Sequence, residues 1–168
     1  MKIAMQQSDG ANLLITLLVR FPEIFSVRYE QARNSLVFTF LIKKKLNHRE
    51  LEDVKNRFHE YLELYSSFDP ISHKKGSLDS FLIDSITFLV YEQSPQELHT
   101  YELKLLTGLL REQFQDRLCM EDLKLRTEEQ DRQETTIQHV LGQTHMFPHE
   151  KNIEVVRDGH HVYVYNKQ

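Results

Sequence analysis

The stretch FSVRYEQARNSLVFTFLI, residues 25–42, decides the class of fold. Polar and apolar residues alternate over 25–30, which is the pattern of a half-buried β-strand. Residues 36–42 are apolar on both faces except at Thr39, as in a strand that lies inside a sheet. The polar residues 31–34 between the two runs predict a turn, so the stretch is expected to form a β-hairpin.

Helical patterns lie on both sides of this hairpin. Ahead of it, helix-capping residues at 8–10 precede apolar residues at helical spacing, and this pattern stops at Pro22. After it, Asn47 and Glu50 have the spacing of a capping box. Apolar residues then recur at steps of three and four as far as Tyr65, which predicts an amphipathic helix of about five turns.

A third strand is predicted over residues 81–91, where apolar side chains occupy both faces. Residues 67–79, which separate this strand from the preceding helix, contain few apolar residues and are expected to form the main loop. Because a helix connects the hairpin to this strand, we expect a right-handed crossover and a parallel strand pair.

Two more helices are predicted in the second half of the chain. Ser94, Pro95 and Glu97 match a helix cap, a first helical residue and the reciprocal acceptor of a capping box. The apolar pattern that follows predicts a helix that continues through Leu118. A fourth helix is expected over about 120–141, with apolar ends, a polar middle and a glycine after its last residue.

The C-terminal segment IEVVRDGHHVYVY, residues 153–165, predicts a second β-hairpin with Asp158 and Gly159 as a two-residue turn. With Arg157 opposite His160, four apolar side chains share one face: Ile153, Val155, Val162 and Val164. A two-stranded ribbon is marginally stable alone, so this face must be buried against the main sheet, the fourth helix or another copy of the chain. We expect these four residues to form an association surface.

These elements predict an α+β fold: one domain with a mixed sheet of about five strands, made of two hairpins and one crossover strand, packed with about four helices. Residues 1–118 are expected to form the core. Residues 119–168 contain the acidic helix and the second hairpin, and they belong either to the same domain or to an arm that mediates association. The acidic character is local, since residues 112–134 contain eight acidic and four basic residues.

Composition excludes several classes of protein. The chain has 168 residues, a formal net charge of −4 and one cysteine, so it is neither a disulfide scaffold nor a multi-cysteine zinc protein. Its five glycines do not form a phosphate-binding loop or a dinucleotide-binding motif. No apolar stretch reaches transmembrane length and the first residues do not resemble a signal peptide, so a cytoplasmic protein without a membrane partner is expected.

A basic segment follows the predicted interior strand. Residues 43–57 contain three acidic residues and six basic ones: Lys43, Lys44, Lys45, Arg49, Lys55 and Arg57. Proteins that bind single-stranded RNA combine basic residues with aromatic side chains on a strand, and Phe38 and Phe40 precede this segment. The alternative is that both phenylalanines face the core and the lysines only mark the exposed end of a strand.

Three histidines, His139, His145 and His149, are candidate metal ligands near the predicted fourth helix. Pro148 prevents 145–149 from forming one continuous helix, so the spacing alone does not make a ligand set. A surface that responds to pH is an equally simple interpretation of these histidines.

From the sequence we expect a non-enzymatic cytosolic α+β module that acts through protein–protein contacts, including self-association, and that needs no cofactor. The first alternative is an RNA-associated factor that uses the basic 43–57 surface. The second alternative is a metal-binding enzyme that depends on His139, His145 and His149. The identity of a protein partner does not follow from the sequence.

Overall fold

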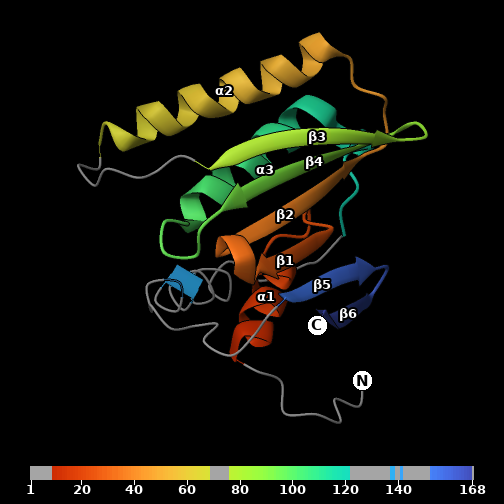
Figure 1. Ribbon diagram of the computed structural model, residues 1–168. Helices are drawn as coiled ribbons and strands as arrows, with labels where there is room; N and C mark the ends of the chain where they lie inside the picture. Colours follow the sequence, from red (N-terminus) through yellow and green to blue (C-terminus); the bar gives the residue numbers. More distant parts are fainter. Residues whose placement is uncertain (1–8, 69–75, 122–136, 139–140, 142–151, 168) are drawn as a thin grey trace.

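The computed structural model describes residues 9–68, 76–121, 137–138, 141 and 152–167. In this part of the chain, six strands form one antiparallel sheet that packs with three α-helices (Figure 1). The helices are α1 (Asp9–Arg20), α2 (His48–Ser66) and α3 (Thr100–Phe114). The strands are β1 (Ser26–Glu30), β2 (Ser35–Ile42), β3 (Ser77–Ile83), β4 (Ile86–Gln93), β5 (Asn152–Asp158) and β6 (His161–Lys167). Their order across the sheet is β3-β4-β2-β1-β5-β6, and the predicted α+β class is confirmed.

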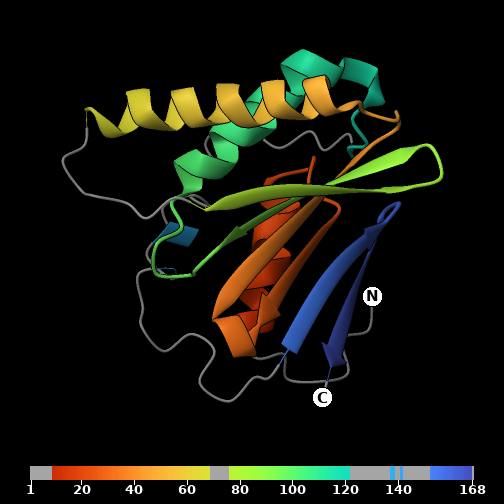
Figure 2. The same ribbon diagram turned by 45° about the horizontal axis from the view of Figure 1, so that its top comes forward.

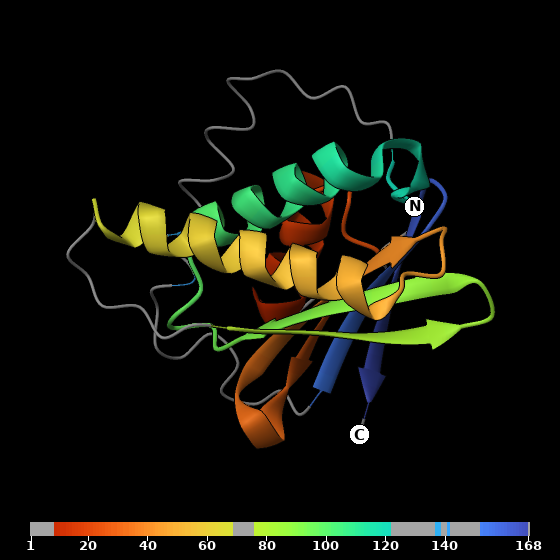
Figure 3. The ribbon, with the colours of Figure 1, turned by 90° about the horizontal axis from the view of Figure 1, so that it is seen from above.

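The core lies between the sheet and the helices, which all cover the same face of the sheet (Figure 3). Alternate residues of β2 point into it, and Leu36, Phe38 and Phe40 are fully buried. Leu14 and Leu17 of α1 are also fully buried there. Complete burial of one such side chain contributes about 1.5–3 kcal/mol, so this layer supplies the main hydrophobic stabilisation.

Two local predictions are confirmed. The stretch that contains β1 and β2 forms a hairpin, with Val27 opposite Phe38 and a short 3₁₀ turn (Gln31–Arg33) between the strands. The capping box of α2 is present in both directions. The Glu50 amide donates to the Asn47 side chain at 2.8 Å, and the Asn47 amide donates to the Glu50 carboxylate at 2.9 Å.

The predicted parallel crossover is wrong, because every strand pair in the described sheet is antiparallel. The segment predicted as one strand over 81–91 is a hairpin, and its first strand, β3, begins at Ser77 inside the predicted loop. The chain reverses at Asp84, which adopts the left-handed conformation with φ 53°. β4 therefore returns antiparallel to β2, and the sheet has six strands instead of about five.

The predicted start of the third helix is also wrong. Ser94 begins a turn, in which its carbonyl oxygen accepts hydrogen bonds from the amides of Glu97 and Leu98 at 3.2 and 3.0 Å. α3 starts after His99, whose amide donates to the Glu102 carboxylate at 2.7 Å. α3 ends at Phe114 instead of continuing through residue 118, and a 3₁₀ turn (Gln115–Arg117) follows it. Most of the predicted fourth helix, 120–141, lies outside the described residues.

The C-terminal hairpin is confirmed, but its predicted turn and register are wrong. The turn consists of Gly159, with φ 58°, and His160, so Arg157 faces Val162. The register differs from the predicted one by two residues, and an even shift leaves each side chain on its predicted face. β5 pairs with β1 along its length, with Val155 opposite Val27, so the hairpin continues the main sheet.

Candidate functional site

Connecting segments from distant parts of the sequence meet at one end of the sheet (Figure 2). The strand registers place the β3–β4 turn, the β2–α2 loop and the β5–β6 turn together there. Residues 117–121 join them, because Leu118 forms an isolated β-bridge with Ile42 and the Glu121 amide donates to the Pro22 carbonyl at 3.0 Å. We call this side of the molecule the loop end, and the opposite side the far end.

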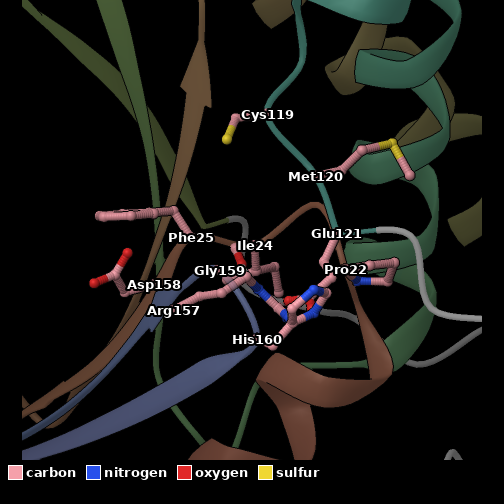
Figure 4. A pocket seen from close by; sticks show the side chains of 10 residues that line it. All are labelled: Pro22, Ile24, Phe25, Cys119, Met120, Glu121, Arg157, Asp158, Gly159 and His160. Atoms are coloured by element: carbon pink, nitrogen blue, oxygen red, sulfur yellow. Dashed lines mark hydrogen bonds and ion pairs between the residues drawn. The ribbon is translucent and has the colours of Figure 1, made fainter.

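The loop end contains a pocket of about 400 Å³ between the lead-in to β1, residues 119–121 and the β5–β6 turn (Figure 4). Its wall is mainly apolar. The residues that line it are Pro22, Ile24, Phe25, Cys119, Met120, Glu121, Arg157, Asp158, Gly159 and His160. A concave apolar site with a few convergent polar groups is the usual form of a ligand pocket.

Arg157 lies at the base of this pocket and bonds to three segments that are distant in the sequence. It lies on the core-facing side of β5, and its guanidinium donates to the backbone carbonyl of Leu18 and, at 3.3 Å, to that of Ile24. It also donates to the Glu121 carboxylate at 2.6 Å. The Leu18 carbonyl belongs to the last turn of α1, where no intrahelical donor is available, so Arg157 serves as a C-terminal cap from a distant strand.

Glu121 connects Arg157 to the mouth of the pocket. Its second carboxylate oxygen lies 2.7 Å from Nδ1 of His160, an exposed residue of the β5–β6 turn. The hydrogen bond from Arg157, and after it the one from His160, lowers the pKa of the Glu121 carboxyl below its ordinary value. The negative charge of the Glu121 carboxylate and the positive charge of the Arg157 guanidinium compensate each other. The pocket is therefore better suited to an uncharged apolar group than to an ion.

The basic segment lies partly at the loop end, and its residues do not converge on one site. Lys43, Lys44 and Lys45 are exposed in the β2–α2 loop, where Lys44 pairs with Glu50. Arg49 is exposed in the first turn of α2, and Lys55 is half-buried further along that helix.

The third basic residue of α2, Arg57, is directed toward α3. Its guanidinium donates to Gln113 at 3.3 Å and pairs with Glu112 at 3.5 Å. Phe38 and Phe40 are fully buried beneath the helices, so they do not provide a stacking surface for bases next to the lysines.

The candidate metal ligands His139, His145 and His149 lie outside the described residues. Within the described ranges, no group of three or more His, Cys, Asp or Glu side chains is placed to hold a metal ion. His59 and Glu63, one turn apart on α2, form an exposed pair at 3.5 Å.

The four predicted association residues of the C-terminal hairpin share the helix-covered face of the sheet, two of them in the core and two packed against it. Ile153 and Val155 of β5 are buried beneath α1, beside β1. Val162 and Val164 of β6 are half-buried and pack against the same core. The β5 part of this face is therefore covered within one chain, by α1, and the β6 part is half-covered.

Exposed apolar side chains concentrate on two other elements, and their exposure was not predicted from the sequence. Seven of the ten large hydrophobic residues that are exposed in the described structure belong to α2, its C-terminal end or β3. They are Tyr61, Leu64, Tyr65, Phe68, Phe81, Leu82 and Ile83. The four residues of α2 and its C-terminal end lie toward α3, because Tyr65 stacks on Tyr101 of α3 with ring centroids 4.2 Å apart and the Tyr61 hydroxyl accepts a hydrogen bond from Arg57 at 3.4 Å. The other three residues lie at the end of β3, which is an edge strand of the sheet (Figures 1 and 3). We call this strand end, residues 81–83, the β3 edge patch.

None of the helices in the described part of the chain combines the length and apolarity needed to cross a membrane. No known family model, curated protein or solved structure matches this chain.

Proposed function

We propose that this chain is a protein-interaction module whose contact surface is the β3 edge patch. The observation that carries the proposal is the exposure of Phe81, Leu82 and Ile83, which are 49%, 45% and 51% exposed at the end of β3. Contiguous apolar surface of this kind marks interaction sites in soluble proteins. Phe81 also stacks on Phe88 of β4 with ring centroids 4.8 Å apart, which keeps its ring in a fixed place on the sheet.

The edge itself supports the proposal. β3 runs antiparallel to β4 in unbroken register from Ser77 to Ile83, and its other side has no partner strand in the described structure. An edge strand is normally protected by lysine, proline, a bulge or a covering segment. Within β3 the only charged residue is Asp79, and neither lysine nor proline occurs.

The test is proximity labelling in the cells that produce the protein. The labelling enzyme is fused to the wild type, to the double variant Phe81→Ser/Ile83→Ser and to a matched control, Tyr163→Ser/Tyr165→Ser. Tyr163 and Tyr165 are 45% and 51% exposed on β6, the opposite edge, so the control removes similar apolar surface from another place.

The proteins labelled by the wild type should be lost with the β3 variant and retained with the β6 control. Identical labelling by all three fusions would contradict the proposal. Far-ultraviolet circular dichroism of each purified variant shows whether the fold is retained, which is expected because the replaced side chains are half exposed.

A further inference from the structure

The pocket at the loop end has an apolar wall and polar groups at its base and mouth (Figure 4). Pro22, Phe25 and Met120 belong to the wall. The thioether of methionine adapts its shape and makes favourable contacts with aromatic rings. A flat aromatic ligand therefore finds contacts on this wall.

The volume of the pocket sets the size of such a ligand. A dry apolar cavity of about 150 Å³ is enough to bind benzene. The loop-end pocket has a volume of about 400 Å³, which is within the range of small-molecule sites. A system of two fused rings therefore fits it.

Most backbone amides of the wall are already used inside the protein. The amides of Ile24, Phe25, Cys119, Glu121 and Arg157 donate to backbone carbonyl oxygens at distances between 2.8 and 3.0 Å. A ligand that is rich in polar groups would lose its bonds to water here without gaining these amides as donors. The body of the ligand is therefore expected to be apolar.

The charged groups of the pocket are also committed. The side chains of Arg157 and Glu121 are only 10% and 11% exposed, and they pair with each other. Asp158 is exposed, and its carboxylate points away from Glu121 and His160 (Figure 4). An ionic ligand would find no unpaired opposite charge at the base, so the ligand is expected to be uncharged.

His160 offers one polar contact at the mouth. The Glu121 carboxylate, 2.7 Å from Nδ1 of His160, has a lowered pKa, so it is ionised at neutral pH and can only accept a hydrogen bond. Nδ1 therefore carries the proton, and in the neutral imidazole Nε2 is an acceptor. The His160 side chain is almost fully exposed, and no described residue donates to Nε2.

We propose that the loop-end pocket binds an uncharged aromatic molecule of about two fused rings that carries a hydroxyl group. The rings lie against the apolar wall, and the hydroxyl donates to Nε2 of His160. This binding is independent of the proposed function, because residues 81–83 of the β3 edge patch do not line the pocket.

The probe is 2-naphthol, titrated into the full chain at neutral pH by isothermal calorimetry. Two compounds with the same rings are matched controls, since 2-methoxynaphthalene cannot donate a hydrogen bond and 2-naphthoate is an anion. Loss of one hydrogen bond should make 2-methoxynaphthalene bind about two- to tenfold more weakly than 2-naphthol. The charge of 2-naphthoate should weaken binding by at least about tenfold, because the anion would be desolvated beside the Glu121 carboxylate.

His160→Phe tests the hydrogen bond, and His161→Phe is its matched control. His161 is also exposed, and it does not line the pocket. His160→Phe should reduce the affinity for 2-naphthol to that for 2-methoxynaphthalene and leave the latter nearly unchanged. His161→Phe should change neither affinity, and thermal unfolding shows whether each variant is folded.

Cys119 reports where the probe binds, because it is the only cysteine of the chain and it lines the pocket. Saturating 2-naphthol should slow the alkylation of Cys119 by N-ethylmaleimide several-fold, and 2-naphthoate at the same concentration should not.

Four outcomes would overturn the proposal. They are no binding of 2-naphthol up to its solubility limit, equal affinity for 2-naphthol and 2-methoxynaphthalene, unchanged affinity for 2-naphthol in His160→Phe, and binding that leaves the alkylation rate of Cys119 unchanged.

Discussion

Replacing Arg157 by methionine should destabilise the fold strongly, although the new side chain is apolar and of similar length. The substitution leaves the carbonyl oxygens of Leu18 and Ile24 without their donor in a buried place. A buried polar group that loses its partner costs about 1–3 kcal/mol. Two such groups, offset by the gain from an apolar side chain, give a loss of about 3 kcal/mol in the free energy of unfolding.

The assay is urea unfolding followed by circular dichroism, with a thermal melt as a second measurement. For a chain of this length, a loss of about 3 kcal/mol lowers Tm by about 6–12 °C. Arg157→Lys is the matched control for charge. It keeps a cation but cannot reach two carbonyls and a carboxylate together, so it should recover only part of the loss.

A double-mutant cycle with Glu121→Gln separates the carbonyl contacts from the ion pair. If the carbonyls carry most of the effect, Arg157→Met should remain costly in the Glu121→Gln background, with a coupling energy of about 1 kcal/mol. A loss below about 1 kcal/mol for Arg157→Met alone would refute the reasoning, because water would then be replacing the guanidinium at both carbonyls.

Three further predictions concern other parts of the molecule. The pKa of Glu121 is lowered in the folded state, so its carboxylate stabilises the fold above the ordinary pKa of 4.5 and loses this effect as the pH falls through the lowered value. The difference in the free energy of unfolding between wild type and Glu121→Gln, measured by urea unfolding, should therefore be constant near neutral pH and shrink in acid. Gly76→Ala should destabilise by about 1–3 kcal/mol, since a Cβ there would lie 2.5 Å from the Tyr91 hydroxyl and 2.7 Å from a backbone oxygen; an unchanged Tm would contradict this. The wild type should not bind labelled single-stranded RNA at physiological salt in a fluorescence anisotropy titration, and salt-dependent binding that is lost when glutamate replaces the lysines at 43–45 would restore the RNA interpretation.

Predictions from the sequence succeeded where the decisive interaction is contained in a few consecutive residues. Asn47 and Glu50 satisfy each other's backbone amides, so the start of α2 depends on nothing outside the motif. The hairpin of β1 and β2 is similarly local, because its strands are joined by a single short turn.

The start of α3 shows why a local motif can fail. Ser94 and His99 both precede a glutamate by three residues, and the sequence around Ser94 matches the preferred cap more closely. The structure uses Glu102 because its buried carboxylate also accepts a hydrogen bond from the Tyr91 hydroxyl at 2.9 Å. Burial, followed by this contact with Glu102, raises the pKa of Tyr91. The contact fixes the helix start, and no local pattern reveals it.

The β3–β4 turn and the candidate sites were not predicted because they too depend on tertiary arrangement and not on a local motif. Residues 81–91 have apolar side chains on both faces, so they show no alternation of polar and apolar residues that a turn would interrupt. The reversal at Asp84 and Ser85 therefore leaves no signal in the hydrophobic pattern. The exposure of β3 follows from its place at the edge, and strand order is a property of the whole sheet. The pocket depends on contacts between Arg157 and residues 36 to 139 positions earlier in the chain.

The pairing of β5 with β1 sets the order in which the molecule can be completed during translation. The hydrogen bond from the Gln31 amide to the Asn152 side chain spans 121 positions, so β1 waits for its second neighbour until most of the chain has been made. At about 5–20 residues per second, this interval lasts on the order of 6–24 s. Throughout it β1 is an edge strand and α1 lacks its cap from Arg157. The nascent chain is thus most prone to aggregation before residues 152–167 emerge from the ribosome, and chaperone dependence should concentrate in that period.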